Sequence, residues 1–148
     1  MSVEIRLLGP EDAPLLDQVA EGVFDDPVAP ASLRHFLATP NHHLVVARDK
    51  GEIVGFVSAV HYHHPDKAAP ELWLNEFGVA PIHEGQGIGG ALLDALLAHA
   101  RRLGCSDAWV LTDRINERAM RLYASRTEIA PSDHVMFTFR LADRPRGD

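Results

Sequence analysis

The chain of 148 residues is poor in several residue types, and each shortage excludes a class of structure or site. Its single cysteine, Cys105, leaves no intrachain disulfide and no zinc site built from several cysteines. Aromatic residues make up 7% of the sequence. No apolar run approaches the roughly 18 residues that a membrane-spanning helix needs, and no N-terminal stretch has signal-peptide form. We therefore expect a cytoplasmic protein with no membrane partner.

Positive charge is also scarce. The chain has 14 Lys and Arg against 21 Asp and Glu, which gives a formal net charge of −7. Proteins that bind nucleic acid need basic surfaces, so we expect no nucleic-acid partner, whereas an acidic surface is compatible with a cationic substrate or with solubility alone. The length and the 46% hydrophobic composition indicate one domain over residues 1–141, followed by a charged tail over residues 142–148.

Glycine, by contrast, is concentrated in the stretch 75–93 (NEFGVAPIHEGQGIGGALL). Gly85, Gly87, Gly89 and Gly90 leave backbone N–H groups uncovered by side chains. A long amphipathic helix follows, and its positive dipole end points at the same place. The stretch therefore predicts an anion-binding turn, and the alternative is a glycine-rich turn without a ligand.

The hydrophobic periodicity predicts the order of the other elements. The sequence indicates an α/β (α+β) fold, in which a hairpin of apolar, β-branched strands lies at the centre. Predicted strands cover residues 3–8, 43–48, 53–62, 72–79, 108–111 and 135–141, with a loop over 63–70; predicted helices run from Pro10 to Val23, over 30–37, from the glycine turn to Gly104, and over 116–125.

Two nucleotide-binding motifs compete for the glycine turn. Gly85, Gly87 and Gly90 have the spacing G-x-G-x-x-G of dinucleotide-binding folds. In those folds the motif comes early and directly after a strand, whereas here about 80 residues precede it and Pro81 intervenes. A phosphate loop of the Walker type is excluded because no Gly-Lys-Ser/Thr follows.

The turn taken with its flanks resembles the acetyl-CoA signature of the GNAT superfamily of N-acetyltransferases. A strand that ends in Phe-Gly-Val (77–79) is followed by Ala-Pro (80–81), and residues 84–89 follow the form Q/R-x-x-G-x-G/A. The first position departs from the family pattern because Glu84 stands where the signature has Gln or Arg. Contacts from backbone N–H groups between Gln86 and Gly90 do not depend on that residue.

A second motif extends the resemblance. Residues 116–123 (NERAMRLY) are similar to the family's N-x-x-A-x-x-L-Y helix, although the glycine that usually follows it is missing from residues 124–129. The resemblance implies a mixed, mostly antiparallel sheet flanked by helices, acetyl-CoA as the cofactor, direct transfer in a ternary complex, and a homodimer. It implies cofactor contacts from Phe77, Gly78, Val79, Glu84, Gly85, Gln86, Gly87, Ile88, Gly89, Gly90, Asn116 and Tyr123.

Catalytic roles follow from the same resemblance and from the chemistry of amine acetylation. Tyr123 is expected to act as general acid and the backbone of Phe77 to bind the developing oxyanion, while packing alone is the alternative role for Tyr123. Glu76 lies in an otherwise apolar strand, where a carboxylate is costly unless it faces a cleft, so we predict that it is the base. A cross-strand ion pair is the alternative, and Asn75 and Glu71 are neighbours able to share the role.

The acceptor is expected to be a small cationic amine. The segments 72–81 and 133–141 are similar to small aminoglycoside 3-N-acetyltransferases of the GNAT type, which suggests an aminoglycoside. A protein or peptide amine and a non-catalytic CoA-binding module remain as alternatives. The cluster 61–64 (HYHH) offers His61 and His63 on one strand face but no third ligand, so we expect no metal. The predicted acceptor-binding residues are Asp25, Asp26, Asn75, Glu76 and His134.

Overall fold

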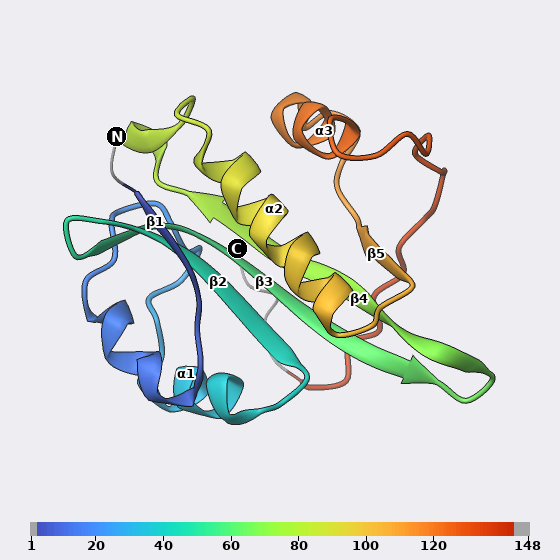
Figure 1. Cartoon of the computed structure of the whole chain (residues 1–148), viewed down its shortest axis with the longest axis horizontal. Coiled ribbons are helices and arrows are strands. Elements are labelled where there is room, and N and C mark those ends of the chain that lie inside the picture. Colours follow the sequence, from blue (N-terminus) through green and yellow to red (C-terminus); the bar gives the residue numbers. More distant parts are fainter. Residues whose placement is uncertain (1–2, 144–148) are drawn as a thin grey trace.

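A computed structural model of the chain describes residues 3–143. Its centre is a five-stranded sheet in the order β1-β2-β3-β4-β5, formed by Glu4–Leu7, His42–Asp49, Glu52–His64, Lys67–Val79 and Asp107–Val110 (Figure 1). The first four strands are antiparallel, and β5 runs parallel to β4. This arrangement confirms the predicted α/β (α+β) class with a mixed, mostly antiparallel sheet.

Helices cover both faces of the sheet. Helix α2 (Ile88–Arg102) connects β4 to β5 and crosses one face, where Ile88 and Leu92 approach Gly55 of β3. The 3-10 helix η1 (Pro10–Asp17) and α1 (Pro30–Ala38) contact each other and pack on the other side, where Phe24 stacks on Phe56. The short helix η2 (Pro81–His83) precedes α2, and α3 (Glu117–Ala124) follows β5.

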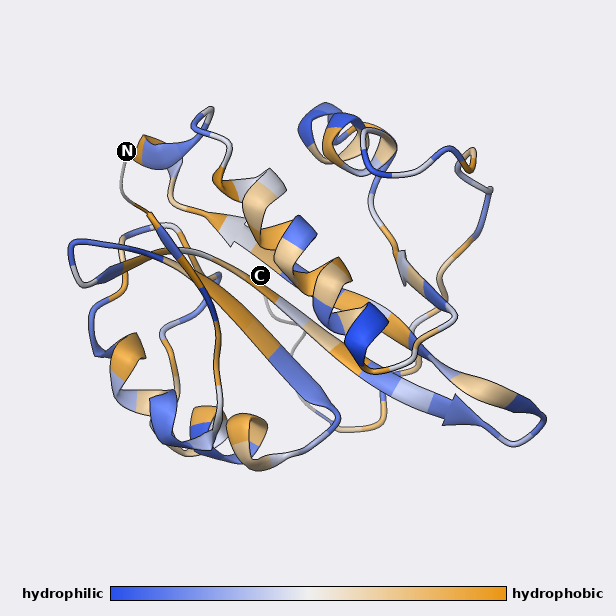
Figure 2. Ribbon diagram, in the orientation of Figure 1, coloured by the Kyte–Doolittle hydropathy of each residue, from blue (hydrophilic) through white to orange (hydrophobic). Residues whose placement is uncertain are grey.

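The hydrophobic core covers both faces of the central strands: α2 packs on one face, and on the other Leu16, Val23 and Leu37 are buried. Apolar colour follows β2 and β3 in Figure 2, whereas the far end of the β3–β4 hairpin is hydrophilic. The largest fully buried side chains come from β2, β3, β4 and α2. None of the helices in the described part of the chain combines the length and apolar composition that a bilayer crossing requires.

The predicted helix from Pro10 to Val23 is wrong. The structure has a 3-10 helix that ends at Asp17, after which Val19 forms a parallel bridge with Ile53. Pro14 lies inside this segment and removes one backbone N–H, which disfavours a continuous α-helix. The segment is held instead by the Asp12 carboxylate, which accepts hydrogen bonds from the Gly9 N–H and from Arg6.

Two predictions about strands are also wrong. The predicted loop over residues 63–70 is short, because β3 continues to His64 and β4 begins at Lys67. The predicted strand over 135–141 is not formed, and Val135, Phe137 and Phe139 are about four-fifths exposed. Its alternating pattern suits a strand, but β-pairing needs a neighbouring edge, and this segment does not pair with β5. Residues 144–148 of the predicted tail lie outside the described residues.

Candidate active site

A cavity of about 600 Å³ opens between the end of β4, the start of α2 and α3. We call it the glycine-loop cavity. All but one of the residues predicted to contact the cofactor or to act as general acid line it: Phe77, Gly78, Val79, Glu84, Gly85, Gly87, Ile88, Gly89, Gly90, Asn116 and Tyr123. The exception is Gln86, whose side chain turns to His83. Glu76, the predicted base, lines a neighbouring cavity.

The cavity exists because two strands separate. β4 pairs with β5 only as far as Leu74 and Val110, whereas it stays paired with β3 to Val79. The last residues of β4 therefore have no partner strand on the β5 side among the described residues, and their backbone on that side is available to a ligand. The pairing of β4 with β3 also skips Asn75. Such bulges redirect side chains at the ends of strands, and Asn75 lines two cavities.

The loop before α2 is built for close approach to its backbone. Gly85 and Gly87 have φ of +79° and +81°, a region that L-residues rarely adopt, and a Cβ at either position would point into open space. Gly87 is the N-cap of α2, so the N–H groups of the first turn lie beside it without partners inside the helix. Loop and helix end together form a cradle suited to a phosphate group.

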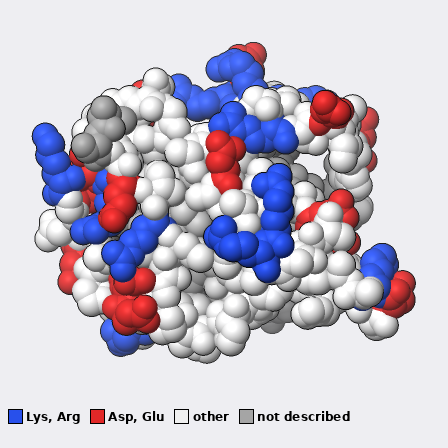
Figure 3. Space-filling view, in the orientation of Figure 1, with Lys and Arg blue, Asp and Glu red and all other residues white. Residues whose placement is uncertain are grey.

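Helix α3 supplies positive side chains to this cavity, and these arginines are not among the predicted site residues. Arg118 and Arg121 line the cavity, and Arg118 forms an ion pair with Glu84. The carboxylate that departs from the family pattern is thereby neutralised by an arginine from another element. Two arginines three residues apart on the predicted helix, on the face toward the glycine turn, were the available signal. Lys and Arg side chains gather over α2 and α3 in Figure 3, with acidic side chains between them.

Tyr123 lines the same cavity. Its ring meets that of Phe77 edge-on, with 6.4 Å between the centroids. Burial raises the pKa of the Tyr123 hydroxyl, so the group stays protonated to still higher pH than an ordinary tyrosine. The residue combines a packed ring with a hydroxyl that is available as a proton donor at neutral pH.

Asn116 has a structural task in addition to its place in the cavity wall. Its side-chain oxygen accepts a hydrogen bond of 3.1 Å from the N–H of Ala119 and caps α3. Gly78 is similarly constrained, because a Cβ there would come within 2.1 Å of the carbonyl oxygen of Val23. Both residues therefore have structural roles, the cap of α3 for Asn116 and close contact with Val23 for Gly78, in addition to their place in the cavity wall.

A second cavity, of about 980 Å³, adjoins the first and shares Asn75, Phe77 and Asn116 with it. We call it the acidic cavity. Asp25, Glu76 and Asp113 line it together with His134 and Trp109, and no Lys or Arg is among its described lining residues. Glu76 is exposed to this space and not buried, as expected of a carboxylate that faces a cleft. A cavity with three carboxylates and no Lys or Arg among its described lining residues favours a cation.

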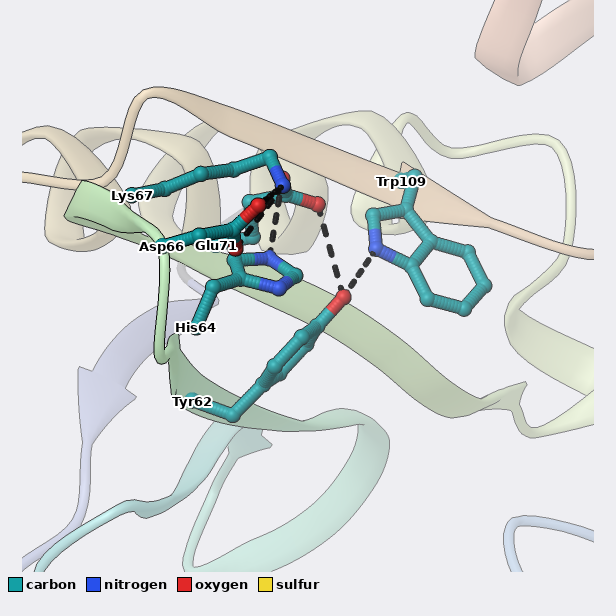
Figure 4. A network of polar contacts seen from close by, with 6 residues as sticks. All are labelled: Tyr62, His64, Asp66, Lys67, Glu71 and Trp109. Atoms are coloured by element: carbon teal, nitrogen blue, oxygen red, sulfur yellow. Dashed lines mark hydrogen bonds and ion pairs between the residues drawn. The ribbon is translucent and has the colours of Figure 1, made fainter.

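Trp109 is held in the cavity wall by a network on β3, β4 and β5 (Figure 4). Its Nε1–H donates to the hydroxyl of Tyr62 at 2.7 Å, and Tyr62 in turn donates to Glu71 Oε1 at 3.4 Å. His64 Nε2 lies 3.1 Å from the other oxygen of Glu71. Glu71 is thus engaged away from both cavities, so the structure does not bring it together with Glu76.

A third cavity, of about 310 Å³, lies between the sheet and the elements η1 and α1. It shares Asp25, Phe56 and Glu76 with the acidic cavity, and Asp26 lines it. The five predicted acceptor-binding residues are therefore all placed along two adjoining cavities. Asp113 and Trp109 are not among the predicted site residues; the available signal for Asp113 was a carboxylate two residues after the predicted strand over 108–111.

The histidine cluster lies elsewhere. His61 Nδ1 is 2.7 Å from Nε2 of His43, whose Nδ1 is 3.0 Å from Nε2 of His99 on α2. Burial, together with the neighbouring histidines, lowers the pKa of His43 from 6.5 to about 4. Over residues 3–143, no group of three or more His, Cys, Asp or Glu is arranged to hold a metal ion. The three contacting histidines, His61, His43 and His99, instead join α2 to the sheet.

Comparison with known proteins agrees with this arrangement. The sequence pattern of the Acetyltransferase (GNAT) family matches residues 13–126, which is more than half of the chain. N-alpha-acetyltransferase RimI of Mycobacterium tuberculosis is 38% identical over 104 residues, which cover 70% of this chain and 62% of that protein. The chain thus spans less than two thirds of the length of this relative.

Solved structures show the same fold at lower identity. An aminoglycoside acetyltransferase, meta-AAC0020, from an uncultured soil metagenomic sample has a TM-score of 0.80 at 22% identity, with 95% of this chain and 97% of that chain covered. The ribosomal-protein-alanine N-acetyltransferase of Brucella melitensis has a TM-score of 0.72 at 24% identity, with 95% and 100% covered. These neighbours act on different acceptors, so the likeness shows the fold alone.

Proposed function

Because the chain belongs to the GNAT family of acetyltransferases, which use acetyl-CoA, we propose that it acetylates a primary amine of a small cationic acceptor. An aminoglycoside is one candidate, since aminoglycoside acetyltransferases are among the structural neighbours. The observation that carries the proposal is the acidic cavity, which meets the glycine-loop cavity at Asn75 and Phe77. A cationic amine and an acetyl donor would meet at this junction.

The residues present fit acetyl-CoA. The open cradle at Gly85 and Gly87 and the start of α2 would hold its pyrophosphate through backbone N–H groups, and Arg118 and Arg121 would supply positive charge. When bound, acetyl-CoA supplies an acetyl thioester and a thiol leaving group. The unpaired edge of β4 from Asn75 to Val79 lies beside the same cavity, where its backbone would hold the pantetheine arm.

Three groups of the chain would divide the chemistry. Glu76 accepts a proton from the ammonium of the acceptor, since only the neutral amine is nucleophilic. The backbone N–H of Phe77 stabilises the negative charge that develops on the carbonyl oxygen. Tyr123, whose raised pKa keeps its hydroxyl protonated, holds the proton that the departing thiolate needs. The amine attacks directly, in a complex with both substrates.

The experiment is an acetylation assay of the purified chain with acetyl-CoA and three groups of acceptors: aminoglycosides, polyamines and peptides. Turnover of a small amine, with at least a tenfold lower kcat in Tyr123→Phe and unchanged CoA binding by calorimetry, is the expected result. Acetylation of protein amines alone would contradict the small-acceptor proposal. CoA binding without turnover on any acceptor would mean a binding module instead of an enzyme.

A second candidate acceptor is the α-amine of a peptide or protein. It is favoured by the relative from Mycobacterium tuberculosis, which is named an N-alpha-acetyltransferase. This relative is 38% identical to the chain, whereas the aminoglycoside acetyltransferase meta-AAC0020 is 22% identical. Mass spectrometry of peptides that differ only in a free or blocked N-terminus would separate the two acceptor classes.

A homodimer is also part of the proposal. The segment 135–141 exposes Phe137, Phe139 and Leu141, the last at 96%, and β5 is paired on one side only among the described residues. Exposed apolar side chains and an unpaired strand edge are two features that favour association with a second copy. Sedimentation velocity should give the mass of a dimer, and Phe137→Asp combined with Phe139→Asp should give the mass of a monomer.

A further inference from the structure

The third cavity differs in chemistry from the acidic cavity that it adjoins, and we call it the apolar cavity. Phe56 and Leu44 from the sheet, each 4% exposed, form its floor, and η1, α1 and the loop between them form its walls. Phe24 stacks on Phe56 with 4.1 Å between ring centroids. Its apolar lining residues include Leu16, Phe24, Val28, Leu33, Phe36, Leu44 and Phe56.

Carboxylates stand where the apolar cavity meets the acidic one. Asp25 and Glu76 line both cavities, and Asp26 lines the apolar one. Glu76 pairs in the sheet with Ser58, which pairs with Leu44, so one row of side chains leads from the carboxylate to the apolar floor. No Lys or Arg is among the described residues that line either cavity. An ammonium at Glu76 therefore has an apolar space directly beside it.

The volume of the apolar cavity, about 310 Å³, sets the size of what it would accept. It lies at the lower end of the range for small-molecule pockets, and one branched aliphatic or phenyl group would fit. A polyhydroxylated sugar ring would lose its hydrogen bonds with water against phenylalanine and leucine side chains, which is unfavourable. The lining selects for an apolar substituent.

We propose that the apolar cavity is a specificity subsite that takes an apolar group attached next to the reacting amine. This inference rests on the proposed acetylation at Glu76 and narrows its acceptor. The acceptor is then an amphipathic primary amine with one leucine-sized or phenyl-sized apolar group close to the nitrogen. A free alkylamine or arylalkylamine and the N-terminal residue of a peptide both present this chemistry.

The test is a comparison of kcat/KM across matched acceptors with acetyl-CoA. Leucinamide and phenylalaninamide should exceed glycinamide by at least about tenfold, since apolar groups in a fitting pocket discriminate by such factors. 2-Phenylethylamine and a peptide with N-terminal leucine distinguish the two sources of the apolar amine. Kanamycin and spermine serve as polar cationic acceptors.

Two variants act on the subsite from opposite directions. Leu33→Trp on α1 should fill it and reduce the ratio of leucinamide to glycinamide severalfold, whereas Phe36→Ala should enlarge it and favour phenylalaninamide over leucinamide. Thermal melting and the Kd for CoA, measured on both variants, establish that each is folded.

The outcomes separate this inference from the function on which it rests. Acetylation of kanamycin or spermine at a kcat/KM equal to or above that of leucinamide, unaffected by Leu33→Trp, would overturn the subsite and leave the acetyltransferase proposal intact. Absence of turnover on every acceptor would overturn both.

Discussion

The glycine-loop cavity and the acidic cavity lie side by side but are built in different ways. The former is lined mainly by one continuous stretch, residues 74–90, which carries the glycine loop, and by residues of α3. The latter is made of side chains from segments far apart in the chain, including Asp25, Glu76, Trp109 and His134. The first suits the cofactor, which every member of the family shares, and the second suits the acceptor, which differs between members.

The difference shows where substitutions should act. A backbone cradle tolerates changes of side chain, as Glu84 illustrates, because its N–H groups stay in place and its charge is balanced by Arg118. In a cavity lined by side chains, substitution of any lining residue alters which ligand binds. Binding of CoA and choice of acceptor should therefore respond to different sets of mutations.

The largest effect is expected for Glu76→Gln. Loss of the proposed base should lower kcat by about 10²–10³-fold at neutral pH, because the acceptor ammonium has lost its proton acceptor. CoA binding, measured by calorimetry, should not change. Glu52→Gln, an exposed carboxylate at the β2–β3 turn, is the control and should keep full activity. Equal activity of the two variants would remove Glu76 from the mechanism.

Acidification should lower the free energy of unfolding through His43, which joins α2 to the sheet through its contacts with His99 and His61. The pKa of His43 is about 4 in the fold against 6.5 when unfolded, so the unfolded chain binds the proton first as pH falls. The contribution of His43 to the free energy of unfolding is complete above pH 6.5 and is lost between pH 6.5 and 4, by about 3 kcal/mol at most. Urea unfolding across this range measures the slope.

His43→Gln tests the assignment of that slope. The variant should be less stable at pH 7 and should show a smaller loss between pH 6.5 and 4, since one buried imidazole is gone. His35→Gln, at an exposed position of α1, should keep the slope of the wild type. A slope that persists undiminished in His43→Gln would place the proton uptake elsewhere.

Gly87→Ala tests the backbone cradle. An L-residue at φ +81° costs about 1–2 kcal/mol, and relief of that strain would shift the loop, so the Kd for CoA should rise about tenfold. Gly51→Ala is a matched control, since Gly51 has the same φ and equally open space but lies in the β2–β3 turn. It should lower Tm similarly and leave CoA binding unchanged. Equal Kd values in both variants would contradict a backbone cradle.

The smallest effect is expected at Glu84. Glu84→Gln removes the partner of Arg118 and frees its guanidinium for phosphate, so CoA should bind about two- to fivefold more tightly at low salt, with the gain shrinking as salt rises. Asp66→Asn, which removes the partner of Lys67 at the distant hairpin turn, should have no such effect. Weaker CoA binding in Glu84→Gln would mean that the carboxylate itself contacts the cofactor.

The sequence by itself determined the glycine-loop side. Positive φ at Gly85 and Gly87 and an N-terminus of α2 beside them are local properties, and the periodicity of 3.6 or 2 residues placed most helices and strands. Local patterns failed where a long-range partner decides: Val19 bridges to Ile53 where a helix was predicted to continue, and the segment 135–141 has no pairing strand.

The tertiary structure alone decided the acceptor side. Asp25, Glu76 and Trp109 are separated by dozens of residues, and the packing of η1 and α1 against the sheet brings the first two together around an apolar space. Sequence spacing carries no information about such a meeting, because it depends on how whole elements pack. The ion pair of Glu84 with Arg118 has the same origin, since it forms only once α3 lies across the glycine turn.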